Sequence, residues 1–206
     1  MSDAARNEEP GNDKASVSLT ISTAAEMRAL GRSLATALRA GDLVILSGGL
    51  GAGKTTLTQG IGAGLGVRGP VTSPTFVIAR VHPPLAAALT DGPRPALVHA
   101  DAYRLGSTLE LDDLDLDTDT AASVTVVEWG EGLAEGLAAD RLEITITPRP
   151  AGATVTGENE TGGNERASAG DPGDPTEDAP RTVRISAVGE RWEGIELPLA
   201  SLADRL

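Results

Sequence analysis

A glycine-rich loop between an apolar run and a helix-like repeat is the feature that most constrains the fold of this chain. It lies within residues 44–66, VILSGGLGAGKTTLTQGIGAGLG. Gly48, Gly53, Lys54 and Thr55 match the phosphate-binding pattern GxxxxGK followed by Ser or Thr. Glycines let successive backbone N–H groups converge on phosphate oxygens, and the following helix points its positive end at them. The segment predicts an α/β fold with a phosphate-binding loop; the alternative is an ordinary strand-to-helix glycine turn.

Two residues of the loop and two acids farther along the chain are candidates for the chemistry. In such loops the lysine, here Lys54, reaches the β- and γ-phosphates, and the hydroxyl of Thr55 ligates magnesium. A neighbouring strand end must then supply an acid that holds or orients the metal and its waters. Asp101 follows the apolar run ALVHA, and Glu128 follows VTVV. The alternative for each acid is a solvated carboxylate or a cap, and the sequence does not decide which acid is catalytic.

Hydrophobic periodicity alternates between strand-like and helix-like segments along the chain. One helix is predicted from the spacing of Met27, Leu30, Leu34 and Leu38 and should end at Gly41. A second helix follows the glycine loop and should be weakened by its internal glycines, each of which costs about 1 kcal/mol against alanine. We expect a central, mostly parallel sheet flanked by helices, with the last two strands forming a C-terminal hairpin. The predicted strands span residues 17–22, 43–47, 76–81, 96–101, 123–128, 142–147 and 182–188.

Length and composition indicate one soluble domain with two polar segments. The chain has 206 residues, and we expect a disordered tail at residues 1–15 and a single α/β domain with a phosphate-binding loop at 16–206. An insert predicted at residues 150–180 is too polar to offset its ordering entropy and should be disordered. There is no cysteine, which excludes disulfides and thiolate metal sites. No apolar run is long enough to span a membrane, and we expect a cytoplasmic protein without membrane contact.

The charge of the chain argues against direct binding of nucleic acid. The formal net charge is −13 at pH 7, whereas neutralising phosphates requires a basic face. Aromatic residues make up only 2% of the chain and offer few surfaces for base stacking. We therefore expect no DNA binding, and contact with any RNA only through partner proteins.

The segment TSPTF, residues 72–76, could respond to bound nucleotide. Pro74 favours an extended path that could present Thr75 to a γ-phosphate. The alternative is a rigid turn into the next strand, and spacing alone does not separate the two. His82 and His99 are interpreted as ordinary strand residues, since no pair of histidines has metal-ligand spacing.

Four motifs in order give the chain a resemblance to a known family. The stretches SGGLGAGKTTLTQGIGAGLG, VTSPTF, HADAYRL and VVEWGE together resemble the bacterial TsaE family of tRNA threonylcarbamoyladenosine biosynthesis ATPases. The resemblance implies a compact ATPase that works with TsaD and TsaB in modifying adenosine 37 of tRNA, with ATP and Mg²⁺ as cofactors. One departure is Gly49, where the family usually has aspartate.

The resemblance also implies roles for individual residues. Thr55 and Glu128 would serve magnesium, Asp101 would be a catalytic or metal-linked acid, Thr75 would belong to a switch-like segment, and Trp129 would lie near the nucleotide. The implied nucleotide-binding residues of the loop are Gly48, Gly51, Ala52, Gly53, Lys54, Thr55 and Thr56.

Other functions share the glycine loop. A small-molecule kinase is the main alternative, although such enzymes usually carry an arginine-bearing lid. A GTPase is less well supported, because no NKxD guanine-reading motif occurs. A nucleotide-binding scaffold that does not hydrolyse is a further alternative because of Gly49.

Overall fold

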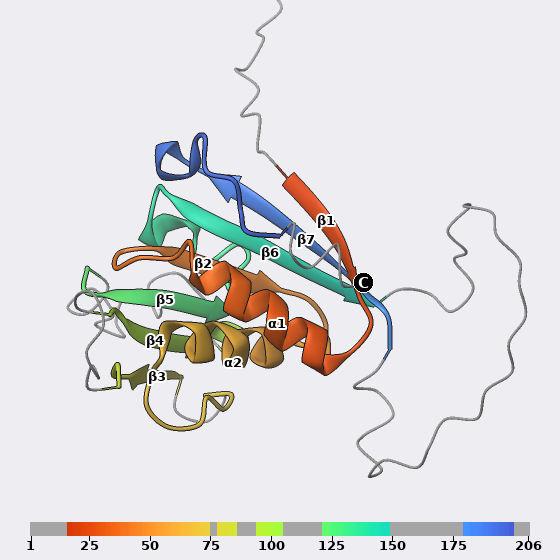
Figure 1. Ribbon diagram of the computed structural model, residues 1–206, viewed down its shortest axis with the longest axis horizontal. Helices are drawn as coiled ribbons and strands as arrows, with labels where there is room; N and C mark the ends of the chain where they lie inside the picture. Colours follow the sequence, from red (N-terminus) through yellow and green to blue (C-terminus); the bar gives the residue numbers. More distant parts are fainter. Residues whose placement is uncertain (1–15, 75–77, 86–93, 105–120, 149–178, 200–206) are drawn as a thin grey trace, which may run out of the picture.

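The structure of the chain is a computed structural model. It describes residues 16–74, 78–85, 94–104, 121–148 and 179–199, which contain seven strands and two α-helices (Figure 1). The predicted tail at 1–15, nearly all of the predicted insert at 150–180, and Thr75 lie outside these described residues. In chain order the elements are β1 (Ser16–Ile21), α1 (Ala24–Ala35), β2 (Leu43–Ser47), α2 (Lys54–Leu65), β3 (Ala79–His82), β4 (Ala96–Asp101), η1 (Ala102–Arg104), β5 (Ser123–Glu128), η2 (Glu135–Leu137), β6 (Arg141–Pro148), β7 (Arg181–Val188) and η3 (Glu190–Trp192).

All seven strands form one mixed sheet in the order β1-β7-β6-β2-β5-β4-β3. The four central strands are mutually parallel, through the pairs β6–β2, β2–β5 and β5–β4. The outer strands β1, β7 and β3 join by antiparallel pairs. The expectation of a mostly parallel sheet is therefore wrong, because hydrophobic periodicity marks a strand but not the direction in which it pairs. β6 and β7 pair antiparallel from Arg141 opposite Val188 to Pro148 opposite Arg181.

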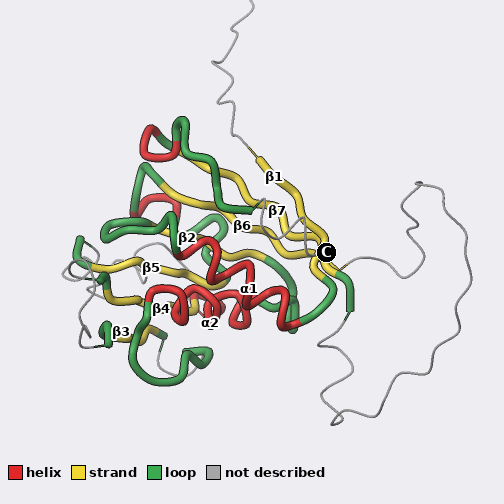
Figure 2. Tube along the Cα trace, in the orientation of Figure 1, coloured by secondary structure: helices red, strands yellow, loops and turns green. Residues whose placement is uncertain are grey.

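Both α-helices pack against the same face of the sheet, side by side (Figures 1 and 2). Thr23 starts α1 with a capping box, in which its hydroxyl accepts from the Glu26 N–H and Glu26 reaches back to the Thr23 N–H. The helix ends at Ala35, six residues before the predicted stop at Gly41. The hydroxyl and the N–H of Thr36 both bond to the carbonyl of Ser33, and the chain turns there while Leu38 stays buried.

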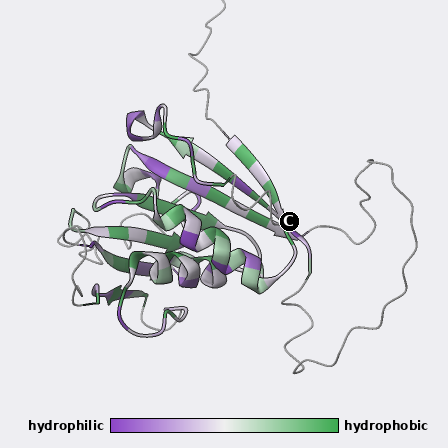
Figure 3. Ribbon diagram, in the orientation of Figure 1, coloured by the Kyte–Doolittle hydropathy of each residue, from purple (hydrophilic) through white to green (hydrophobic). Residues whose placement is uncertain are grey.

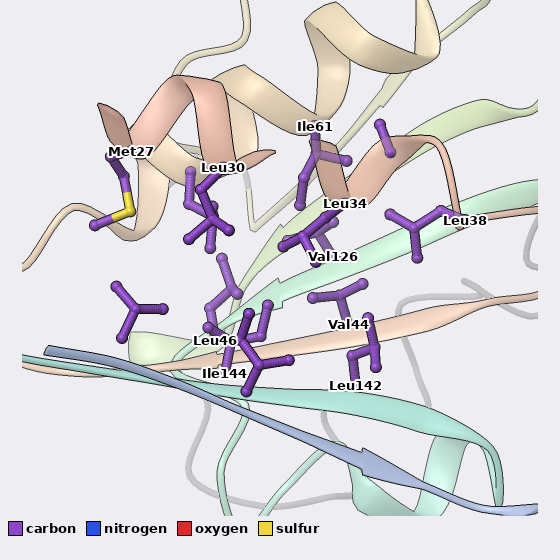
Figure 4. Packing of buried hydrophobic residues seen from close by; sticks show 14 of the residues in the cluster. Met27, Leu30, Leu34, Leu38, Val44, Leu46, Ile61, Val126, Leu142 and Ile144 are labelled. Carbon is purple, nitrogen blue, oxygen red and sulfur yellow. The ribbon is translucent and has the colours of Figure 1, made fainter. Parts of the chain in front are cut away.

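Strand β2, in the middle of the sheet, is apolar on both faces because both of its faces are covered. Along β2, Val44 and Leu46 join the core beneath α1 and α2, whereas Leu43 and Ile45 face a second, smaller cluster. Figure 4 shows side chains of α1 and α2 meeting those of β2, β5 and β6 in the larger core. Along the outer strands β1 and β7, apolar and polar residues alternate instead (Figure 3).

The strands that carry the candidate site have the predicted bounds. β2, β4 and β5 match residues 43–47, 96–101 and 123–128. β3 is shorter than the predicted 76–81, and residues 75–77 lie outside the described chain. Among the described residues, no helix is both long enough and apolar enough to cross a membrane. Because β2, β4 and β5 are parallel neighbours, their carboxyl ends meet at one edge of the sheet.

Candidate functional site

The glycine loop connects the end of β2 to the start of α2, and its path requires glycine at two points. Gly48 has a φ of +143°, and a Cβ atom there would lie 2.4 Å from the carbonyl oxygen of Ile146. Gly53 has a φ of +106° and is the N-cap of α2. This conformation is one that glycine alone adopts readily. No side chain caps α2 at Gly53, so the N–H groups of its first turn keep the partial positive charge of a helix start.

The ammonium group of Lys54 is held inside the loop. Its Nζ donates to the carbonyl oxygens of Gly48 at 2.8 Å and Gly49 at 2.9 Å. It also lies 3.6 Å from the centroid of the Trp129 ring, within cation–π range. Burial lowers the pKa of Lys54, and the carboxylates of Glu128 and Asp101 partly oppose that shift. A cation with little water around it attracts an incoming anion more strongly than a solvated one does.

A hydroxyl and a carboxylate meet beside this lysine. The Oγ1 atom of Thr55, in the first turn of α2, donates to Glu128 Oε1 at 2.8 Å and lies 3.1 Å from Oε2. Glu128 ends β5, and the parallel register places Asp101, the last residue of β4, opposite it. Hydroxyl and carboxylate oxygens are ligands that Mg²⁺ prefers. Within the described ranges, no group of three or more His, Cys, Asp or Glu side chains could hold a metal alone, so a magnesium ion here would need water and phosphate oxygens as well.

Asp101 is fixed by bonds on both of its carboxylate oxygens. Oδ2 accepts from the hydroxyl of Ser73 at 3.2 Å, and Oδ1 accepts from the backbone N–H of Tyr103 at 3.0 Å. The backbone N–H of Asp101 donates to the carbonyl of Ile78. These contacts link the acid to both sides of the segment that contains Thr75. The switch role expected of Thr75 stays a prediction.

Trp129 follows β5 in a conformation unusual for a bulky residue. Its φ is +60°, and its N–H donates to the carbonyl of Leu46. The ring packs against that of Tyr103, with centroids 5.1 Å apart and planes tilted by 53°. The strained backbone turns the indole towards Lys54 at the edge of the sheet. Such strain in a non-glycine residue persists only where surrounding contacts hold it.

These residues surround one cleft of about 410 Å³. Two of the predicted site residues do not line the cleft. Gly48 is absent from its lining, although its carbonyl accepts from Lys54, and Thr75 is outside the described chain. The others all line the cleft: Gly51, Ala52, Gly53, Lys54, Thr55, Thr56, Asp101, Glu128 and Trp129. The lining that the sequence did not predict comprises Ala24, Met27, Leu50, Ser73 and Arg181.

Two neighbours of the site were missed for different reasons. Arg181 begins β7 and reaches the cleft only because β7 lies beside β1 and β6, a pairing without a local signal in the sequence. His99, which bonds to Glu128, could have been found. It lies two residues before Asp101 in the same strand, so the period of two places both on one face.

The fold and the cleft define the class of protein: an α/β protein with a mixed sheet, whose polar cleft opens beside a strand, glycine-loop and helix unit. The family model described as Threonylcarbamoyl adenosine biosynthesis protein TsaE matches residues 21–154. The chain belongs to this family.

Individual relatives and one solved structure agree with that assignment. The tRNA threonylcarbamoyladenosine biosynthesis protein TsaE of Streptomyces coelicolor is 56% identical over 167 residues, which cover 81% of this chain and 93% of the relative. The protein of the same name from Bacillus subtilis is 39% identical over 122 residues, which cover 59% of this chain and 71% of the relative. The crystal structure of Bacillus subtilis YdiB superimposes with a TM-score of 0.57 and 26% identity, over 93% of this chain and 97% of that one.

Proposed function

We propose that this protein binds ATP and Mg²⁺ in the cleft and hydrolyses the nucleotide as a component of tRNA threonylcarbamoyladenosine modification, acting with TsaD and TsaB. Family membership supports the role in this modification. The observation that carries the nucleotide chemistry is the convergence of Lys54, Thr55 and Glu128 at the uncapped start of α2. On this proposal the loop is a phosphate-binding loop of the P-loop class.

The residues of the cleft fit a magnesium nucleotide. The loop presents backbone N–H groups and a partly desolvated ammonium to phosphate oxygens, and it is open to solvent at Gly51 and Leu50. When bound, the magnesium ion would neutralise charge on the phosphates and orient the terminal one. Lys54 would release one of its backbone carbonyls to contact phosphate, and the indole of Trp129 would keep water from its other side.

The two acids have different partners, which supports assigning them different roles. Glu128 already accepts a hydrogen bond from the hydroxyl of Thr55, so we assign these two residues to binding the magnesium ion. Asp101 bonds to Ser73 and Tyr103, not to Thr55, and we assign it to orienting the attacking water. The contact with Ser73 would then couple the position of this acid to the segment that contains Thr75.

The acidity of the chain supports an indirect role towards tRNA. With a net charge of −13, the protein would repel a phosphate backbone rather than bind it. Nucleotide turnover would therefore act on partner proteins that hold the tRNA, by stabilising one conformation before hydrolysis and another after it.

The proposal is tested by measuring phosphate release with the protein alone and with TsaD and TsaB, while threonylcarbamoyladenosine is followed on tRNA in the same reactions. We expect both turnover and repeated modification to require this protein and to be lost in Lys54→Ala, which removes the cation beside the phosphates. Retained ATP binding without any effect on tRNA modification would overturn the proposed partnership and would point to another acceptor. Micromolar ATP affinity in Lys54→Ala would overturn the assignment of the site.

A further inference from the structure

His99 lies directly behind the acid assigned to the metal. It occupies the middle of β4, and its side chain is completely buried. Its neighbours Val98 and Ala100 face the smaller core, so His99 faces the opposite side with Leu97 and Asp101, beneath α2. Its Nε2 atom is 2.8 Å from Glu128 Oε1.

The direction of this hydrogen bond follows from the chemistry of its partners. An ionised carboxylate only accepts, so Nε2 carries the proton and donates to Glu128. The same Oε1 atom also accepts from the hydroxyl of Thr55. Glu128 is thereby held from two sides, by a residue of α2 in front and a residue of β4 behind, and rotation about its side-chain bonds is restricted.

The other ring nitrogen indicates that histidine at this position lowers the stability of the fold relative to an apolar residue. Nδ1 is buried and has no hydrogen-bond partner among the described residues. An unsatisfied buried polar atom costs about 1–3 kcal/mol, and an apolar residue in the row that contains Leu97 would avoid that cost. The bond to Glu128 is the one interaction in the described structure that an apolar residue could not supply.

We propose that His99 is a positioning residue, which orients the carboxylate of Glu128 for binding the magnesium nucleotide. The proposal rests on the proposed function of the cleft. Outer partners of metal ligands typically change metal affinity or activity about 10–100-fold when they are removed. Loss of His99 should therefore lower the affinity for magnesium and slow ATP hydrolysis, whereas the binding of the phosphates by the glycine loop should change little.

Three substitutions separate positioning from simple packing. His99→Gln keeps an N–H donor near the place of Nε2. His99→Asn places its amide nitrogen near the position of Nδ1, and its side chain is too short to reach Glu128. His99→Met fills a similar volume without a donor. If His99→Asn or His99→Met fails to fold, the other one compared with His99→Gln still distinguishes the two roles; if His99→Gln fails, the Mg²⁺ response of the other two relative to their thermal stability does so.

The primary measurement is the Mg²⁺ concentration needed for tight ATP binding, followed through the fluorescence of Trp129 in a Trp192→Phe background. We expect His99→Asn and His99→Met to require at least about tenfold more Mg²⁺ for tight ATP binding and to lower kcat by a similar factor. Their affinity for ATP in excess chelator should stay within about twofold of that of the parent. His99→Gln should restore most of both. Thermal unfolding without ligand provides a readout of packing.

The outcomes of this experiment distinguish the positioning role from the proposed function itself. If His99→Met or His99→Asn responds to Mg²⁺ like the parent, or if all three variants lose binding in parallel with their thermal stability, His99 is a packing residue and the inference is wrong. If the parent itself shows no Mg²⁺-dependent ATP binding, the proposed function fails first, and the inference that rests on it fails with it.

Discussion

Gly60 of α2 lies backbone to backbone against Gly31 of α1. A Cβ atom on Gly60 would be 2.4 Å from the carbonyl oxygen of Arg28 and 2.9 Å from the Cα of Gly31. A Cβ atom on Gly31 would be 2.4 Å from the carbonyl oxygen of Leu57. These separations are shorter than any side-chain carbon tolerates, so the two helices can cross this closely only with glycine at both positions.

The first prediction concerns Gly60→Ala, for which helix propensity and packing give opposite signs. Propensity alone would raise the free energy of unfolding by about 1 kcal/mol. Forcing a methyl group into a filled contact lowers it by about 1–3 kcal/mol, and because the obstacle here is backbone we expect the loss to dominate. Urea unfolding followed by circular dichroism measures the difference.

The matched control is Ala63→Gly, at an exposed position of the same helix. It should lose about 1 kcal/mol through propensity alone. Gly60→Ala as stable as the parent, with Ala63→Gly behaving as expected, would show that α1 and α2 can move apart at little cost.

A second prediction separates the roles of the two acids. Glu128→Gln keeps the size of the side chain but removes the charge that Thr55 and His99 hold in place. We expect nucleotide binding in excess chelator to persist, the Mg²⁺ requirement to rise, and hydrolysis to slow by about 100-fold. Asp101→Asn should slow hydrolysis while leaving the Mg²⁺ requirement near that of the parent.

Steady-state rates over a range of Mg²⁺ concentrations test both variants together. The reverse pattern, with Asp101→Asn sensitive to magnesium and Glu128→Gln unaffected, would exchange the two assignments. An unchanged rate in Glu128→Gln would move the metal role to Asp101.

The residues that could be predicted are those whose signal is local. Apolar runs marked β2, β4 and β5, and the glycine pattern identified the loop and Lys54, because strand formation and loop conformation depend on neighbours in sequence. The internal glycines of α2 were detected as well. Their weakening effect on the helix stays a prediction, and the close contact of Gly60 with α1 has no signal within the segment, since it depends on how the two helices pack.

The parts that could not be predicted depend on pairing between distant strands. Arg181 lines the cleft because β7 lies between β1 and β6, and the antiparallel pairs at that edge of the sheet follow from the same arrangement. The bond from His99 to Glu128 requires β4 and β5 to be adjacent and parallel. Periodicity within one segment carries no information about which strand will be its neighbour.

A third prediction uses the register of β6 and β7. Pro148 lies opposite Arg181, so the two residues that flank the segment 149–180 are adjacent in the sheet. Replacing these residues with a short turn of asparagine and glycine should keep the register and the place of Arg181, and ATP affinity and hydrolysis should stay within about twofold of the parent.

Arg181→Ala in the full chain provides the control for that replacement. Because Arg181 lines the cleft beside the start of α2, its loss should weaken ATP binding measurably. Loss of hydrolysis in a shortened protein that still unfolds cooperatively would instead assign a function to residues 149–180.

The last prediction concerns His82, a buried residue of the edge strand β3. Burial lowers its pKa from the ordinary 6.5, the electrostatic interactions with His99 and Arg80 lower it further by smaller amounts, and a hydrogen bond with the backbone of Arg68 acts in the opposite direction. The unfolded chain therefore takes up a proton near pH 6.5, whereas the folded chain does so only at lower pH.

Stability follows from that difference in proton uptake. The contribution of His82 is complete above pH 6.5, and the free energy of unfolding should fall as pH decreases through and below that value, by at most about 1.4 kcal/mol per pH unit. His82→Gln cannot take up the proton, so its urea-unfolding free energy should depend less on pH between about 6.5 and 5 than that of the parent. Parallel curves for the two proteins would mean that His82 is protonated as readily in the folded state as in the unfolded one, and that the acid sensitivity arises from other groups.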